Sequence, residues 1–166
     1  MSTLTSVAVE KLACIRGGRL LFRDLSFSAS AGEGLSIEGP NGVGKTSLLR
    51  VIAGFLSLAE GSIVINTERA IREPEERGRQ AGWLGHQDGV KSQLTAGEVL
   101  HFFASLHGIS PDIAGFLARA GLERCAELPC QYLSAGQRKR LALARLAMTR
   151  RPLWLLDEPL AALDSG

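Results

Sequence analysis

The sequence predicts an α/β fold in which a helical segment is inserted into a sheet, and three observations carry this prediction. A short strand pattern at residues 34–38 leads into a glycine-rich loop and then into a helical pattern at 45–55. Residues 153–156 form a continuous apolar run, which is typical of a fully buried strand. Between these features, residues 88–150 show helical patterns and no strand pattern, which indicates a helical subdomain.

The N-terminal part predicts strands joined by turns. Residues 7–12 alternate between apolar and polar side chains, as in a half-buried strand. Residues 20–29 form a second strand pattern after the turn signal Gly17-Gly18, and residues 62–66 form a short β-branched one.

The later elements follow from local signals. Residues 68–80 are rich in charge and contain Pro74, so we expect a surface loop there. Trp83 and Leu84 begin a strand that stops at Gly85. The helical patterns lie at residues 94–106, 112–120 and 134–149, followed by the apolar strand at 153–156.

Composition indicates one globular domain covering residues 1–166, with 45% apolar and 22% charged residues. A net charge of +2 gives no reason to expect a nucleic-acid partner. Basic residues crowd between Arg138 and Arg151, and they form either a local basic face or an ordinary solvated helix surface. The three cysteines form no C-x-x-C pair, and no apolar run is long enough to span a bilayer directly.

The strongest motif is a phosphate-binding loop. Residues 39–46 match G-x-x-x-x-G-K-[ST], a pattern whose glycines let backbone N–H groups surround phosphates at the start of a helix. Lys45 adds a positive charge, the Thr46 hydroxyl can ligate Mg²⁺, and Ser47 supplies a second hydroxyl. The predicted nucleotide-binding residues here are Gly39, Pro40, Asn41, Gly42, Val43, Gly44, Lys45, Thr46 and Ser47.

A second motif places two carboxylates directly after the buried strand at 153–156. Ligands of open α/β sheets bind at the carboxyl ends of the strands. We therefore expect Asp157 to hold Mg²⁺ through water and Glu158 to orient or deprotonate the attacking water.

A third motif is Leu133-Ser134-Ala135-Gly136-Gln137. Ser134 and Gln137 have the spacing of a capping box, which predicts that a helix begins here. Ser134, Gly136 and Gln137 are also candidates for binding the γ-phosphate of a nucleotide held by another subunit. Gln87, a loop glutamine after a short strand, gains meaning only beside the other motifs.

Taken together, these motifs resemble the ATP-binding-cassette family over essentially the whole chain. Residues 39–46 are similar to its Walker A motif, Gln87 to its Q-loop, and residues 133–137 to its signature. Residues 153–158 are similar to Walker B, and residues 161–164 to the D-loop. The resemblance implies a P-loop cassette with a central, mostly parallel sheet, an N-terminal antiparallel β part and an inserted helical subdomain.

The resemblance also implies how such a domain works. Two copies would pair head to tail, with each ATP and its Mg²⁺ between the Walker A loop of one copy and the signature of the other. Gln87 would contact the metal and the catalytic water, and the segment around it would transmit motion to membrane permease subunits. Such an ATPase would sit peripherally on the cytoplasmic face of a bacterial inner membrane.

A narrower resemblance is to the ATP-binding subunits of haem exporters used in c-type cytochrome maturation, the CcmA family. It rests on residues 83–91 with 94–96, on the signature at 133–137 and on residues 153–159. This implies permease partners from the cytochrome c maturation system.

The sequence departs from the family pattern at several points. Arg16 stands where the family places an adenine-stacking aromatic residue, which leaves the adenine contact unassigned, and Ala135 replaces a signature glycine. The chain ends at Gly166, before the family's switch histidine, so we expect it to be incomplete at its C-terminus and weakly active alone.

Several alternatives stay open. The cassette could drive an ABC transporter for another substrate, or it could be a soluble ATPase acting in translation or DNA repair. The missing N-K-x-D pattern argues against a GTPase, and Glu158 argues against a regulator that does not hydrolyse nucleotide.

Overall fold

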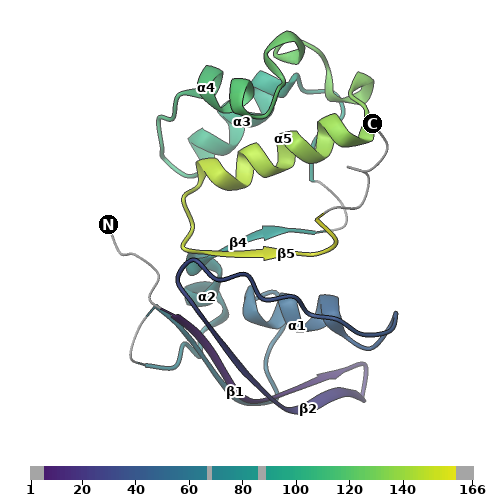
Figure 1. Ribbon diagram of the computed structural model, residues 1–166, viewed down its shortest axis with the longest axis vertical. Helices are drawn as coiled ribbons and strands as arrows, with labels where there is room; N and C mark the ends of the chain where they lie inside the picture. Colours follow the sequence, from purple (N-terminus) through teal and green to yellow (C-terminus); the bar gives the residue numbers. More distant parts are fainter. Residues whose placement is uncertain (1–5, 67–68, 86–88, 160–166) are drawn as a thin grey trace. The chain divides into compact units, whose positions relative to one another are not determined.

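The computed structural model describes residues 6–66, 69–85 and 89–159, so predictions for Gln87 and for residues 161–164 lie outside the described residues. The chain divides into two compact units (Figure 1). The first comprises Met1–Gly82 with Arg151–Leu155, and the second comprises Trp83–Arg150 with Leu156–Gly166.

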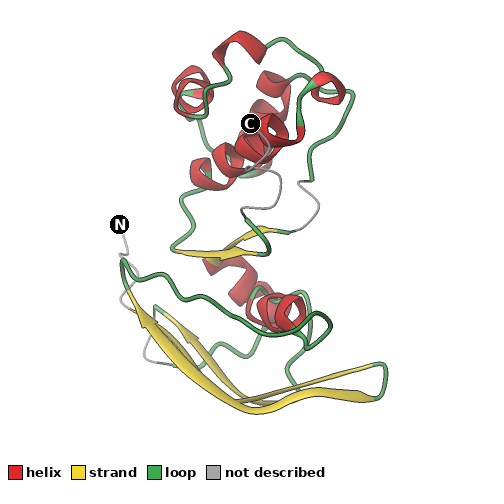
Figure 2. Cartoon of the chain, turned by 45° about the vertical axis from the view of Figure 1, so that its right-hand side comes forward, coloured by secondary structure: helices red, strands yellow, loops and turns green. Residues whose placement is uncertain are grey.

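An antiparallel sheet organises the first unit, as predicted for the N-terminal part. Its strands are β1 (Ser6–Arg16), β2 (Arg19–Ser30) and β3 (Glu60–Ile65), in the order β2-β1-β3 (Figure 2). In register, Val9 of β1 lies opposite Ile63 of β3. Both side chains are buried, so the alternation seen in the sequence marks the face that the sheet turns toward its core.

Helix α1 (Lys45–Ile52) directly follows the glycine-rich loop. Its buried face includes Leu48 and Val51, in agreement with the predicted spacing. A glycine closes the C-terminal end of α1. Gly54, just after the helix, has a φ of +82°, and the N–H of Phe55 donates to the carbonyl of Arg50. This arrangement satisfies the last carbonyl groups of the helix.

Residues 34–38 form no strand in the structure, so that prediction is wrong. The segment has no regular structure, and Leu35 is exposed. A strand needs a hydrogen-bonded neighbour, and none of the strand pairings in the described residues includes this segment. The strand pattern of residues 34–38 does not reveal whether such a neighbour is present.

The predicted surface loop at 68–80 is also wrong in its second half, which forms α2 (Pro74–Gln80). Pro74 occupies the first helical turn, where its missing N–H costs nothing. Arg77 is fully buried, so the charge of this segment does not indicate exposure at every position.

Strands β4 (Ala81–Leu84) and β5 (Leu153–Leu156) pair in a second sheet, where their arrows run in the same direction (Figure 1). The strand at 153–156 is confirmed, and the other strand ends before Gly85 as predicted but begins at Ala81 and not at Trp83. The expectation of full burial for residues 153–156 is wrong, because Leu155 is buried whereas Trp154 is 45% exposed. The apolar run could not show that a two-stranded sheet leaves one face of Trp154 uncovered.

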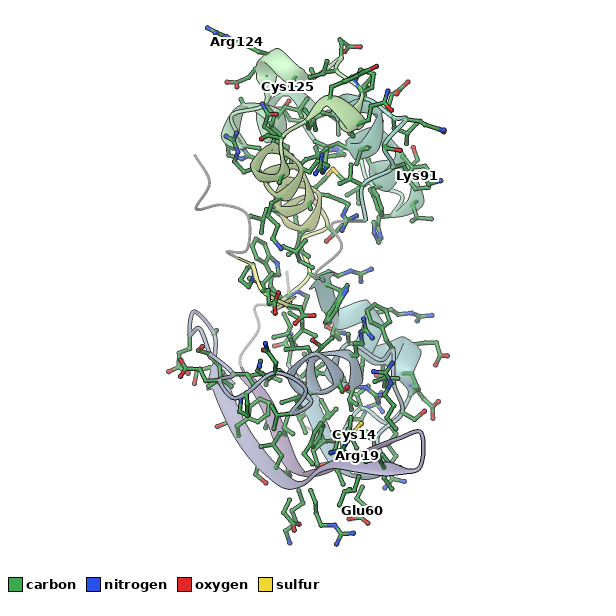
Figure 3. All side chains as sticks on the ribbon, turned by 90° about the vertical axis from the view of Figure 1, so that its right-hand side faces the viewer. Cys14, Arg19, Glu60, Lys91, Arg124 and Cys125 are labelled. Carbon is green, nitrogen blue, oxygen red and sulfur yellow. The ribbon has the colours of Figure 1, made fainter. Side chains whose placement is uncertain are left out.

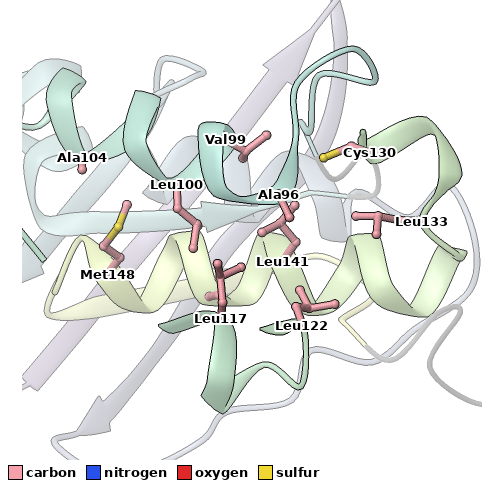
Figure 4. Packing of buried hydrophobic residues seen from close by; sticks show 11 residues of the cluster. Ala96, Val99, Leu100, Ala104, Leu117, Leu122, Cys130, Leu133, Leu141 and Met148 are labelled. Carbon is pink, nitrogen blue, oxygen red and sulfur yellow. The ribbon is translucent and has the colours of Figure 1, made fainter. Parts of the chain in front are cut away.

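Three helices form the core of the second unit: α3 (Ala96–Leu106), α4 (Ile113–Arg119) and α5 (Ala135–Met148). Two short 3₁₀ turns, η1 (Glu123–Cys125) and η2 (Cys130–Tyr132), connect α4 to α5. The buried cluster draws side chains from all three helices and the turns (Figure 4): Ala96, Val99, Leu100, Ala104, Leu117, Leu122, Cys130, Leu133, Leu141, Ala144 and Met148.

Candidate functional site

The glycine-rich loop has the backbone geometry that a phosphate-binding loop needs. Gly39, Gly42 and Gly44 have φ values of +148°, +81° and +111°, which residues with a Cβ rarely adopt. A Cβ on Gly44 would also lie 3.4 Å from the ring of Phe22. The sequence context and these dihedrals together explain why glycine occupies these positions.

The Lys45 side chain folds back onto the glycine-rich loop and binds backbone carbonyls of that loop. Its Nζ donates to the carbonyl of Gly39 at 2.7 Å and to the carbonyl of Pro40 at 3.1 Å. The ammonium group therefore lies at the loop, where it can meet the charge of a phosphate.

The start of α1 favours an anion. Gly44 is the N-cap residue and has no side chain to cap the first turn, which also contains no acidic residue. The N–H groups of a first helical turn and the helix dipole both attract negative charge. Thr46 is half-buried at this end, whereas the Ser47 side chain is only 5% exposed.

Asp157 and Glu158 follow β5 in the second unit. The N–H of Asp157 donates to the carbonyl of Leu84 at 2.8 Å, which continues the contact between β5 and β4 beyond the end of the strand. Asp157 is 8% exposed, whereas Glu158 is exposed and has a φ of +53°. A left-handed backbone at a non-glycine residue is strained, and such strain is common in active sites.

The predicted capping box at the start of α5 is confirmed. The Ser134 hydroxyl accepts a hydrogen bond from the N–H of Gln137 at 3.1 Å, and the Gln137 side chain accepts from the N–H of Ser134 at 2.7 Å. Nε2 of Gln137 also donates to Sγ of Cys125 at 3.5 Å. Ala135 begins the helix, with no positive φ, so this alanine needs none of the freedom of a glycine.

Lys139 also belongs to this region, and the sequence motifs do not single it out. It is 6% exposed, and its Nζ donates to the carbonyl of Glu158 at 3.1 Å. In the sequence it is one of the basic residues between Arg138 and Arg151, for which a basic face and an ordinary solvated helix surface are both possible. Its helical spacing from Ala142 and Leu146, which are apolar, was the available signal.

The predicted residues fall into both units. The glycine-rich loop and Lys45 belong to the first, whereas Ser134, Asp157 and Glu158 belong to the second. Within the second unit, the structure brings Ser134 to Gln137 and Lys139 to Glu158. Among the described residues, no cluster of His, Cys, Asp and Glu side chains could by itself hold a metal ion. No helix in the same residues is long and apolar enough to cross a bilayer.

Comparisons with known proteins agree with this picture. The family model of the ABC transporter matches residues 22–161. The chain is 47% identical to the cytochrome c biogenesis ATP-binding export protein CcmA of Paramagnetospirillum magneticum, over 98% of this chain and 77% of that protein. It is 50% identical to the protein of the same name from Rhodopseudomonas palustris strain HaA2, over 92% of this chain and 76% of that protein.

A solved structure supports the same fold. A putative ABC transporter ATP-binding protein from Pyrococcus furiosus superposes with a TM-score of 0.84, over 97% of this chain and 79% of that chain. The two sequences are 21% identical, so this likeness concerns the fold alone.

Proposed function

The chain belongs to the ABC transporter family and, within it, to the CcmA proteins, and we propose that it is the ATP-hydrolysing subunit of a haem exporter for c-type cytochrome biogenesis. The main support for a nucleotide site is the loop before α1, where three glycines adopt positive φ and the Lys45 ammonium binds the loop backbone. The names of the relatives, cytochrome c biogenesis ATP-binding export proteins, support the export and biogenesis role.

ATP binding follows from the charges at this loop. Backbone N–H groups at the start of α1 would receive the phosphates, and the Lys45 ammonium would leave its two carbonyl partners to contact the β- and γ-phosphates. Gly39–Thr46 would supply most of this contact, with the buried Ser47 supporting the turn from inside.

The candidate side chains carry oxygen donors of the kind that Mg²⁺ binds in proteins. Thr46 offers a hydroxyl and Asp157 a carboxylate, and Gln87 is a third candidate from outside the described residues. Protein sites for Mg²⁺ commonly use one or two carboxylates together with substrate phosphates, so a complete protein cage is not required. The ion would neutralise charge on the β- and γ-phosphates.

Hydrolysis would depend on Glu158. Its carboxylate would orient a water molecule and accept a proton from it as the water oxygen attacks the γ-phosphorus. The bond between the γ-phosphorus and the bridging oxygen breaks, ADP leaves with that oxygen, and inorganic phosphate carries the water oxygen. The exposure of Glu158, next to the buried Asp157, is compatible with access for water.

A second copy of the chain would complete each nucleotide site in a head-to-tail dimer. Ser134, Gly136 and Gln137 at the start of α5 would contact the γ-phosphate held by the partner, because the helix dipole and the first-turn N–H groups that the capping box leaves unused attract anions. Permease subunits of the cytochrome c maturation system would bind the ATPase at the cytoplasmic face of the inner membrane.

Gene deletion with complementation tests the proposal. Deletion should remove covalent haem from c-type cytochromes, and the wild-type gene should restore it whereas Lys45→Ala should not. A Glu158→Gln protein should bind ATP and accumulate as a closed dimer without turnover. Unchanged cytochromes would leave the ATPase assignment standing and overturn the biogenesis role in favour of another substrate or a soluble function.

A further inference from the structure

Lys139 is a charged residue that the fold has buried. Its side chain is 6% exposed, and its Nζ donates to the backbone oxygen of Glu158 across 3.1 Å. Removing an ammonium group from water is unfavourable unless hydrogen bonds compensate for it. The hydrogen bond to Glu158 therefore offsets part of the free-energy cost of burying the Lys139 ammonium group.

The packing of α5 explains why these two residues meet. Ala142 and Leu146 are buried on one face of the helix and pack with Leu84 at the end of β4. Leu156, the last residue of β5, packs against the same cluster. Lys139 lies one turn before Ala142 on this face, and Glu158 follows two residues after Leu156.

Other hydrogen bonds hold the two segments that carry Lys139 and Glu158. The capping box between Ser134 and Gln137 fixes the start of α5, and with it the position of Lys139 along the helix. On the other side, the N–H of Asp157 donates to the carbonyl of Leu84 and holds the chain just before Glu158. The distance between Lys139 and Glu158 is thus determined by two anchored segments.

The backbone of Glu158 needs such support. Its φ of +53° lies in the left-handed region, which is unfavourable for a glutamate and persists only where surrounding contacts hold it. The Lys139 bond acts on the carbonyl group of this same residue. It therefore bears on the backbone conformation from which the Glu158 side chain extends.

We propose that Lys139 is a positioning residue for ATP hydrolysis, which holds the left-handed backbone of Glu158 through its carbonyl oxygen. This inference rests on the proposed role of Glu158 as the residue that activates water. Lys139 contacts neither nucleotide nor water in this account. Its loss should therefore change the chemical step and leave ATP binding nearly unchanged.

The test substitutes Lys139 in the complete protein assembled with its membrane subunits. Lys139→Met keeps the approximate length and removes the donor, so kcat should fall at least about tenfold, because small displacements of catalytic groups cost this much. The KM for ATP and its affinity should change less than about twofold. Lys139→Arg retains a donor and should recover most of the lost kcat.

Arg140 provides a matched control on the same helix. Its Nη1 donates to the carbonyl of Ala120 at 3.0 Å, so Arg140→Met also removes a cation bound to a backbone oxygen. This control should keep the wild-type kcat. The ¹³C carbonyl resonance of Glu158 adds a direct readout, since it should shift in Lys139→Met and stay in place in Arg140→Met.

The outcomes separate this inference from the proposed function. If Glu158→Gln hydrolyses ATP at the wild-type rate, the role of Glu158 fails, and the inference fails with it. If Glu158→Gln is inactive but Lys139→Met has the wild-type kcat, the positioning role alone is overturned. An equal loss of kcat in Arg140→Met would also overturn it, as would a raised KM with unchanged kcat. Should Lys139→Met fail to fold, Lys139→Gln is judged by the same criteria.

Discussion

The guanidinium of Arg77 donates from Nε to the backbone oxygen of Val51 at 3.1 Å, which joins α2 to α1, the helix that follows the glycine-rich loop. Nη1 of the same group donates to the carbonyls of Ile71 and Arg72. Burial lowers the pKa of Arg77, and the carboxylates of Glu73 and Glu75 oppose that effect. An arginine nevertheless stays charged at neutral pH, so these carbonyl contacts offset a desolvated cation.

Removing this side chain should destabilise the protein more than any other change in α2. Arg77→Ala removes the side-chain donor to the carbonyls of Val51, Ile71 and Arg72, of which Val51 keeps the N–H of Gly54, and opens a cavity, which should lower the free energy of unfolding by about 3 kcal/mol or more. Urea denaturation measures the loss. The exposed Arg79 on the same helix is the control, and Arg79→Ala should change stability by less than about 0.5 kcal/mol. Similar losses in both variants would contradict the role given to Arg77.

Gly54 and Gly32 have nearly the same backbone but different surroundings. Their φ values are +82° and +83°. A Cβ on Gly54 would lie 2.1 Å from the carbonyl oxygen of Pro74, whereas a Cβ on Gly32 would meet nothing within 4 Å. Gly32→Ala should cost about 1 kcal/mol for the left-handed backbone. Gly54→Ala should cost at least about 1 kcal/mol more, because the backbone must shift. Equal melting temperatures for the two variants would count against this packing.

Two capping boxes allow the structural and binding roles of Ser134 to be separated. At the start of α3, the Thr95 hydroxyl accepts from the N–H of Glu98 at 3.1 Å, and the Glu98 carboxylate accepts from the N–H of Thr95 at 2.8 Å. Ser134 and Gln137 make the corresponding two bonds at the start of α5. Thr95→Ala and Ser134→Ala should each lower stability by about 1 kcal/mol. Only Ser134→Ala should weaken ATP-dependent dimerisation, measured by light scattering with hydrolysis blocked. Equal dimerisation in both variants would remove Ser134 from the proposed nucleotide site.

Cys14 should make stability depend on alkaline pH. Burial raises the pKa of the Cys14 thiol, which is labelled in Figure 3, above the ordinary value of 9.0, and the positive charge of Arg16 opposes this shift. In the unfolded chain the thiol loses its proton at a lower pH than in the folded protein. The stabilising contribution is therefore complete below pH 9.0 and is lost as the pH rises above that value.

Comparison with Cys14→Ala isolates this effect from other alkaline groups. The stability difference between wild type and variant, measured by urea denaturation at several pH values, should be constant below pH 9 and should shrink above it. A difference that stays constant to higher pH would show that the folded thiol titrates as it does in the unfolded chain.

Local signals in the sequence were sufficient for most elements and motifs. The spacing of Ser134 and Gln137 predicted the start of α5, because a capping box involves only neighbouring residues. The glycine pattern before Lys45 predicted a tight loop for the same reason. The strand predicted for residues 34–38 does not form, since a strand depends on a hydrogen-bonded neighbouring strand that the segment itself does not specify.

The sequence by itself determined the family, the order of its motifs and the residue types that can bind phosphate and activate water, because these depend on short spacings along the chain. Only the tertiary structure decided that Arg77 and Lys139 are buried and which carbonyl groups they bind. Val51 lies 26 residues from Arg77, and Glu158 lies 19 residues from Lys139, whereas the carbonyls of Ile71 and Arg72 are nearer to Arg77 in sequence. The burial of a charge depends on whether distant backbone groups can satisfy it, and no local pattern contains that information.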